Sequence, residues 1–112
     1  MRIAIPSKTG SDVAYFPMHA PKLIVYTYED NGNRTGTSVI DLPEEPDAKL
    51  KIIRDSCEVF LSRDGNRDFL TEIWAEGIWV FIVNDRNPEA AARSFLNGKA
   101  RPFSGGPCTC GR

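Results

Sequence analysis

The chain has 112 residues, of which 41% are hydrophobic, and its 14 Lys and Arg residues against 15 Asp and Glu residues give a net charge of −1. This length suits one compact domain, and the near-neutral charge argues against nucleic-acid binding and against a membrane-surface role. The start "MRIAIPSKTG" has only a short apolar run before Pro6, and no stretch approaches the roughly 20 apolar residues of a membrane span, so a cytoplasmic protein is expected.

The first half of the chain predicts three strands and one long loop. A short apolar run predicts a buried strand at residues 2–6, and two prolines among small polar residues predict a loop over 7–21. β-branched and aromatic residues predict strands at 22–30 and 37–42. The turn cluster "NGNRTG" at 31–36 predicts that these two strands form a hairpin.

The second half alternates between helices and strands. A linker at 43–47 precedes this half, and a tight loop is expected at 63–66. The apolar spacing predicts helices at 48–56, 67–77 and 88–98. It predicts strands at 57–62 and 78–85. Asp47, Asn66 and Asn87 are placed to cap the three helices. Trp74 and Trp79 are expected in the core.

This order of elements predicts an α/β fold with one mixed sheet of five strands. Its last part, β-α-β-α, implies parallel strands joined by right-handed crossovers. Residues 1–98 are expected to form the domain, and residues 99–112 to form a flexible tail rich in Gly, Pro and Cys.

Five segments, taken in order, resemble the dinitrogenase iron-molybdenum cofactor biosynthesis family, which consists of small single-domain accessory factors of nitrogenase. The segments are "MRIAIPS", "APKLIVYTYEDNG", "DSCEVFLS", "EGIWVFIV" and "PEAAARSFLNGKA". The resemblance covers about residues 1–100. It implies a three-layer α/β/α fold with a ribonuclease H-like motif. It also implies a role in nitrogen fixation, as a carrier of the iron-molybdenum cofactor, its precursors or a related iron–sulphur cluster.

The sequence departs from the family pattern in two places. The family's His-Phe-Gly run corresponds here to Phe16, Pro17 and Met18, and the one histidine, His19, follows them. The family's glycine-rich run corresponds to "SRDGN", which contains the single glycine Gly65. Both differences indicate a divergent branch with changed ligand chemistry.

Three polar segments are expected to meet at one edge of the sheet. Ligands of open α/β sheets bind outside the carboxyl ends of the parallel strands, where the loop after Ser7, "SRDGN" at 62–66 and "NDRN" at 84–87 converge. Two of these segments lead into helix N-termini, which favour anions. Three arginines add positive charge nearby: Arg63, Arg67 and Arg86. Ordinary helix caps and solvated arginines explain the same residues without a ligand.

His19 is the best internal ligand for a metal–sulphur group, because imidazole binds metals and the thioether of Met18 beside it is a soft ligand. The alternative is a surface histidine beside a packed methionine. The residues predicted to bind the cofactor are Ser7, Met18, His19, Arg63, Gly65, Asn66 and Asn84.

The three cysteines leave several roles open. Cys108 and Cys110 are able to chelate one metal ion or one cluster iron. The predicted metal ligands are these two cysteines and His19. A full set of about four ligands needs His19, Cys57 or a partner chain, and the last case implies a homodimer. The alternatives are a redox pair and an unliganded tail. Cys57 opens a predicted buried strand, where packing is its expected role.

No enzyme motif accompanies this fold: the first strand carries none of the clustered carboxylates that a nuclease needs, and Asp64 and Asp85 are too few. The sequence therefore predicts a non-enzymatic carrier whose partners are the cluster and the assembly proteins or metalloenzyme that exchange it. Two alternatives stay open, a protein-interaction module without a cluster and a thiol-redox protein that uses Cys108 and Cys110.

Overall fold

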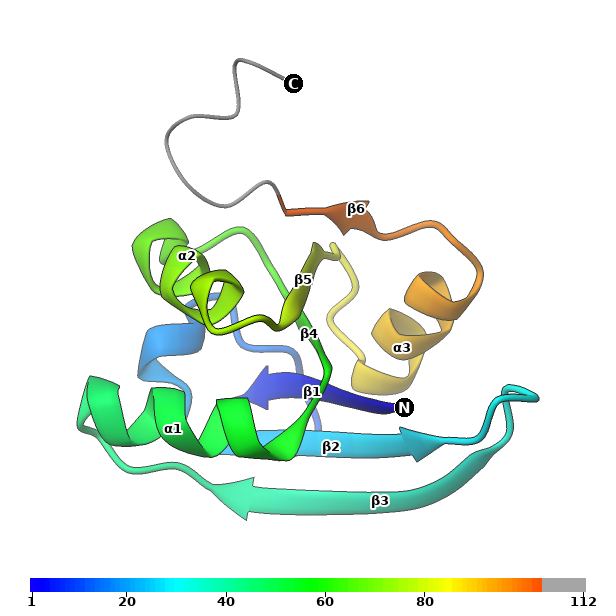
Figure 1. Ribbon diagram of the computed structural model, residues 1–112, viewed down its shortest axis with the longest axis horizontal. Helices are drawn as coiled ribbons and strands as arrows, with labels where there is room; N and C mark the ends of the chain where they lie inside the picture. Colours follow the sequence, from blue (N-terminus) through cyan, green and yellow to red (C-terminus); the bar gives the residue numbers. More distant parts are fainter. Residues whose placement is uncertain (104–112) are drawn as a thin grey trace.

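Six strands form one mixed sheet in the computed structural model, which describes residues 1–103 (Figure 1). They are β1 (Arg2–Ser7), β2 (Lys22–Tyr28), β3 (Arg34–Asp41), β4 (Val59–Ser62), β5 (Trp79–Ile82) and β6 (Arg101–Pro102). Their order across the sheet is β3-β2-β1-β4-β5-β6. β1, β4 and β5 are parallel, whereas β2 is antiparallel to β1 and β3, and β6 is antiparallel to β5. The first five strands have the order and directions of a ribonuclease H-like motif.

Helices cover both faces of this sheet (Figure 1). They are α1 (Pro46–Ser56), α2 (Arg67–Ala75) and α3 (Pro88–Leu96). Residues of α1 and α2 pack on one face in a core that includes Ile53, Phe60, Phe69 and Ile73. Ala91 and Ala92 of α3 pack on the other face. The expected three-layer α/β/α arrangement is therefore confirmed.

The alternation of side chains along β1 explains how one short apolar run serves both cores. Successive residues of a strand point to opposite faces. Ile3 and Ile5 accordingly belong to the cluster under α3, and Ala4 belongs to the cluster under α1 and α2. All three side chains are fully buried, so β1 is the centre of both cores.

The sheet differs from the prediction in its strand count, six rather than five. Arg101 and Pro102, expected in the tail, pair with Ile82 and Phe81. The next residue, Phe103, is buried and donates its backbone N–H to the carbonyl of Val80 at 2.9 Å. The Gly/Pro-rich composition of this region concealed a short edge strand, because two residues are too few to give a strand pattern.

The prediction that both tryptophans lie in the core is wrong. Trp74 is 39% exposed and Trp79 is 68% exposed. Trp79 is the first residue of β5, and the short strand β6 pairs only with the other end of β5. Trp74 follows the buried Ile73 on α2 and so lies about 100° away around the helix.

The cap of α1 differs from expectation, and the cap of α3 agrees with it. α1 begins at Pro46 after Glu45, which places Asp47 inside the first turn rather than at the cap. Asn87 caps α3 as predicted, since its side chain accepts the N–H of Ala90 at 3.1 Å. Within residues 1–103, no helix is long and apolar enough to cross a membrane.

Candidate functional site

The long loop after β1 begins with a compact turn built around one carboxylate. Oδ1 of Asp12 accepts hydrogen bonds from the Ser7 hydroxyl (2.6 Å), the backbone N–H groups of Lys8 and Thr9 (both 2.9 Å) and the Thr9 hydroxyl (3.0 Å). Burial raises the pKa of the Asp12 carboxyl, but these hydrogen bonds outweigh it and hold that pKa below its ordinary value. Asp12 is therefore an ionised structural centre of the turn.

The loop is also fastened to both neighbouring segments that follow β4 and β5. The N–H of Val13 donates to the carbonyl of Arg86 at 3.0 Å, and the N–H of Met18 donates to the side-chain oxygen of Asn66 at 3.2 Å. The three segments predicted to converge therefore do meet at the carboxyl edge, which we define as the edge where β1, β4 and β5 end.

Gly65 and Asn66 make this close approach of the two loops possible. A Cβ atom on Gly65 would lie 2.2 Å from the carbonyl oxygen of Tyr15, so only glycine fits there. Asn66 has a left-handed backbone conformation with φ 53°, and its side chain bonds Met18 rather than capping α2. The expected side-chain cap at Asn66 is wrong because the amide oxygen is already used by the loop.

A single 3-10 turn, Pro17–His19, presents the histidine. The N–H of His19 donates to Phe16 O at 3.1 Å, and the N–H of Ala20 donates to Pro17 O at 3.2 Å. Pro17 is buried beneath the turn, whereas His19 is exposed. The turn thus holds an accessible imidazole over a fixed backbone.

The ammonium group of Lys49, on α1, forms hydrogen bonds with the backbone of this turn. Its Nζ donates to the carbonyls of Met18 and Ala20, the latter at 3.0 Å, and its side chain is almost entirely buried. Burial lowers the pKa of Lys49 below its ordinary value, and the charge of Glu44 opposes that shift.

A cavity of about 430 Å³ lies beside His19 at the carboxyl edge. Its lining includes Lys8, Asp12, Tyr15, Phe16, His19 and Ala20. Tyr15 and Phe16 are exposed aromatic rings with centroids 4.8 Å apart, and the Phe16 ring lies 6.4 Å from the imidazole. The cavity combines an apolar aromatic wall with one imidazole, one lysine and one carboxylate.

None of the other predicted site residues among residues 1–103 lines this cavity. The guanidinium of Arg63 lies 4.8 Å from the centre of the Tyr15 ring. Ser7 is buried under the Asp12 turn, and Met18 is half-buried and packs against the core. Asn84 is exposed and does not contribute to the lining. Cys108 and Cys110 lie outside the described residues.

The two other predicted cations serve different purposes. Arg67 donates to Asp64 at 2.6 Å, and its guanidinium lies 4.8 Å from the ring of Phe103. Arg86 contributes its backbone carbonyl to the anchoring of Val13. Arg63 is therefore the predicted arginine that contacts the wall of the cavity.

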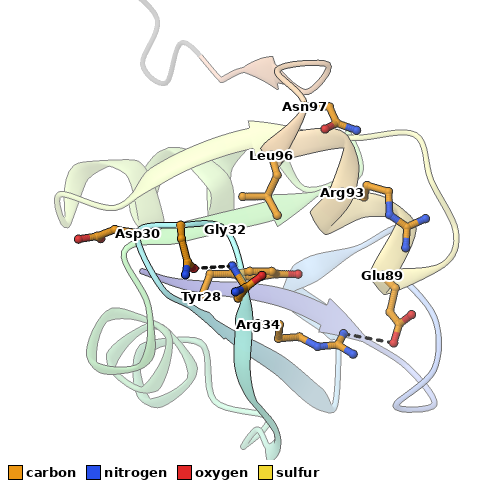
Figure 2. A pocket seen from close by; sticks show the side chains of 10 residues that line it. Tyr28, Asp30, Gly32, Arg34, Glu89, Arg93, Leu96 and Asn97 are labelled. Atoms are coloured by element: carbon orange, nitrogen blue, oxygen red, sulfur yellow. Dashed lines mark hydrogen bonds and ion pairs between the residues drawn. The ribbon is translucent and has the colours of Figure 1, made fainter.

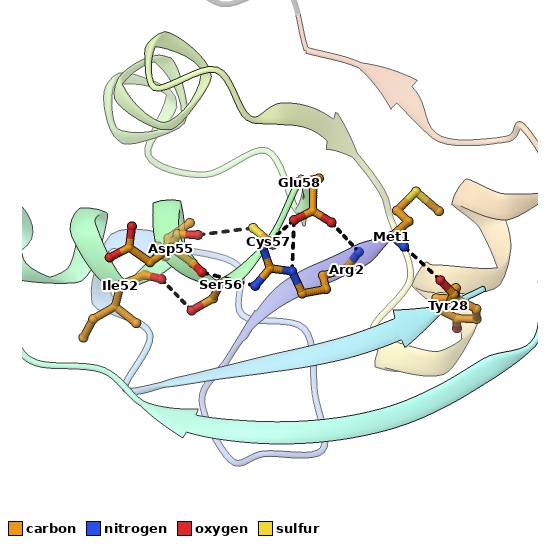
Figure 3. Close-up of polar contacts among 9 residues, drawn as sticks. Met1, Arg2, Tyr28, Ile52, Asp55, Ser56, Cys57 and Glu58 are labelled. Carbon is orange, nitrogen blue, oxygen red and sulfur yellow. Dashed lines mark hydrogen bonds and ion pairs between the residues drawn. The ribbon is translucent and has the colours of Figure 1, made fainter. Parts of the chain in front are cut away.

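Cys57 lies at the opposite, amino edge of the parallel strands, where Arg2 and Glu58 form an ion pair at 2.6 Å (Figure 3). Its Sγ donates to the carbonyl of Ile53 at 3.4 Å. Burial raises the pKa of this thiol to about 12, so it stays protonated and packed. Among residues 1–103, no three His, Cys, Asp or Glu side chains are grouped to hold a metal ion.

A larger cavity of about 670 Å³ lies between the β2–β3 turn and α3 (Figure 2). Four charged residues line it, Asp30, Arg34, Glu89 and Arg93, and two of them are paired: Arg34 donates to Glu89 at 3.2 Å and also stacks over Tyr26 at 5.0 Å. It opens beyond the end of β2, which runs antiparallel to β1 and therefore ends at the amino edge. Among residues 1–103, no imidazole and no thiol lines it.

Sequence reasoning missed the cavity residues Lys8, Asp12, Tyr15 and Phe16, and it missed Lys49. A signal for Lys49 was present, because it lies four residues before the buried Ile53 and so shares its face of α1. A signal for the turn was the Ser7–Asp12 spacing, because a carboxylate readily accepts nearby backbone N–H groups in a loop.

Searches against family models and curated proteins found no match to this sequence. Several solved structures share its fold. A protein described as a candidate dinitrogenase from Methanocaldococcus jannaschii has a TM-score of 0.75 at 13% identity, over 95% of this chain and 97% of that chain. A protein described as a candidate NifB from Thermotoga has a TM-score of 0.71 at 19% identity, over 96% of this chain and 97% of that chain.

The apo form of the orange protein from Desulfovibrio gigas also superposes, with a TM-score of 0.70 at 15% identity over 93% of both chains. At these identities the likeness establishes a common fold.

Proposed function

We propose that this domain is a non-enzymatic carrier that binds a metal–sulphur cofactor or its precursor at the His19 cavity. The observation that carries the proposal is the exposed imidazole of His19, on a hydrogen-bonded backbone turn, beside a cavity of about 430 Å³ at the carboxyl edge. Cofactor sites of open α/β sheets occur at this edge.

The donor set favours a preassembled cluster over a bare metal ion. The described part of the cavity offers one imidazole, and Asp12 already accepts four hydrogen bonds at one of its oxygens. A bare zinc ion needs about four protein ligands, whereas each iron of a cluster takes most of its ligands from bridging sulphide, so a single protein donor can complete one cluster iron. The aromatic rings of Tyr15 and Phe16 give the apolar surface that such a cluster would contact.

The fold and the names of its neighbours support the same cargo. The neighbours described as a candidate dinitrogenase and a candidate NifB share nearly the whole length of the chain with it. This similarity and the resemblance of the sequence support the iron-molybdenum cofactor, its precursors or a related iron–sulphur cluster as cargo. The exchange partners would be cofactor-assembly proteins or a recipient metalloenzyme.

Metal and sulphide analysis with absorption spectra of anaerobically reconstituted protein tests the proposal. His19→Ala should lose most of the bound metal and the cluster absorption. Asn84→Ala, an exposed residue at the same edge that does not line the cavity, is the matched control and should retain both. A Cys108→Ser, Cys110→Ser double variant measures the contribution of the tail. Full metal retention in His19→Ala would refute the site.

A protein-interaction module is the second candidate, and the exposed Trp74 and Trp79 favour it. Large exposed aromatic side chains are typical of protein contacts. They line a small cavity of about 240 Å³ with Gly77 and Ile78. Wild-type protein that takes up no metal under any reconstitution condition would favour this candidate over a carrier.

A further inference from the structure

Lys49 is an unusual residue for the interior of this domain. It is 2% exposed on α1, and no carboxylate of residues 1–103 lies within ion-pair distance of its ammonium. A buried charge without a direct ion-pair partner is costly, and an apolar side chain such as Met fills similar space without that cost. Packing alone therefore does not explain a lysine here.

The acceptors of Lys49 indicate what the ammonium does. They are the carbonyls of Met18 and Ala20, the residues on either side of His19. A hydrogen bond from a charged donor is stronger than one between neutral groups. The 3-10 turn contains only three residues, so it has few hydrogen bonds of its own to define its shape.

We propose that Lys49 is the positioning residue that fixes His19 at the wall of the cavity. Asn66 holds the N–H of Met18 from the α2 side, and Lys49 holds the two flanking carbonyls from α1. The backbone of His19 is thereby clamped from both helices while its imidazole stays exposed. The inference rests on the proposed function for its purpose, but its geometry is tested without metal.

Amide hydrogen exchange followed by NMR tests this clamp. In Lys49→Met, the protection of the His19 and Ala20 amides should fall by about tenfold or more relative to that of Ile53, the loss expected for a charged hydrogen bond. Lys51→Met, at an exposed lysine of the same helix, is the matched control and should leave both ratios unchanged. If Lys49→Met fails to fold, Lys49→Gln takes its place: its amide is a neutral and therefore weaker donor, so the same two amides should lose part of their protection.

The chemical reactivity of the imidazole gives a second readout. His19 is the one histidine of the chain, so its carbethoxylation by diethylpyrocarbonate is followed without interference from other histidines. Lys49→Met should change the rate, and Lys51→Met should not. Equal relative protection and equal rates in Lys49→Met and wild type would overturn the inference. Because neither experiment uses metal, the clamp and the carrier function fail or succeed separately.

Discussion

At the carboxyl edge of the parallel strands an imidazole is exposed beside a cavity, whereas at the amino edge the thiol of Cys57 is buried and keeps its proton. The difference follows from what each edge is made of. At the carboxyl edge a long loop adds polar turns above the sheet, held by Asp12, Asn66 and Lys49. At the amino edge the chain passes directly from α1 into β4, so Cys57 joins the core.

The comparison shows that a metal-binding side chain is not a site by its chemical type alone. A thiolate is a stronger metal ligand than an imidazole, yet burial raises the pKa of Cys57 to about 12, so the thiol keeps its proton and does not form the thiolate. His19 is exposed and lies beside a volume that accepts a ligand. The substitutions below test this contrast, from the largest expected effect to the smallest.

Gly65→Ala should cause the largest loss of stability, about 2–3 kcal/mol, because the added Cβ would overlap the backbone carbonyl of Tyr15. Urea unfolding measures the change. Gly36→Ala is the control, since a Cβ there meets Thr27 at an ordinary 3.9 Å. Equal stability of the two variants would mean that the loops at the carboxyl edge adapt freely.

Asp12→Asn should lower the free energy of unfolding by about 2 kcal/mol near neutral pH, because neutral acceptors bind more weakly than carboxylates. The folded pKa of Asp12 lies below 3.8, so its contribution is full above that pH and is lost as the pH falls. The difference between wild type and variant should therefore shrink from pH 6 to pH 3 in urea titrations. Asp30→Asn, in the exposed hairpin turn, should have little effect at any pH.

Cys57 should make the wild type sensitive to alkali. Its pKa is raised from 9.0 to about 12 on folding, so its stabilising contribution is complete below pH 9 and is lost as the pH rises. By pH 10 wild type should lose about 1.4 kcal/mol relative to Cys57→Ala, as one pKa unit predicts. Parallel unfolding curves at pH 8 and pH 10 measure this. A constant difference would show that the thiol is not shielded.

Glu58→Gln should have the smallest effect, about 0.5 kcal/mol, because its ion pair with Arg2 is solvent-exposed at the amino edge. The loss should decrease further in high salt, which screens exposed charges. A salt-independent loss above that of Asp12→Asn would reverse the proposed contrast between the two edges.

Much of this fold was predictable because strand and helix patterns depend on local sequence. The β-α-β order fixes the direction of β1, β4 and β5, and that direction alone brings the 7–21 loop together with residues 62–66 and 84–87. The two-residue strand β6 carries no such pattern. The burial of Trp79 was predicted wrongly because the exposure of a side chain at the start of a strand depends on whether a neighbouring strand or helix covers it.

The detail of the site was less predictable because it depends on contacts between residues distant in sequence. Lys49 is 29 residues from its acceptor Ala20, and Asn66 is 48 residues from Met18. From the sequence alone, Lys49 resembles a solvated lysine on a helix, and Asn66 resembles an ordinary helix cap. His19 was identifiable from its chemical type and its loop, but the clamp beneath it was not.

Hyperfine spectroscopy of the loaded protein tests the central claim most directly. Because the chain has one histidine, labelling with ¹⁵N-histidine changes the isotope at His19 alone. If His19 binds the cluster, the paramagnetic form should show a nitrogen coupling that changes with the label and disappears in His19→Ala. A bound cluster whose nitrogen hyperfine couplings do not change on ¹⁵N-histidine labelling would contradict the account.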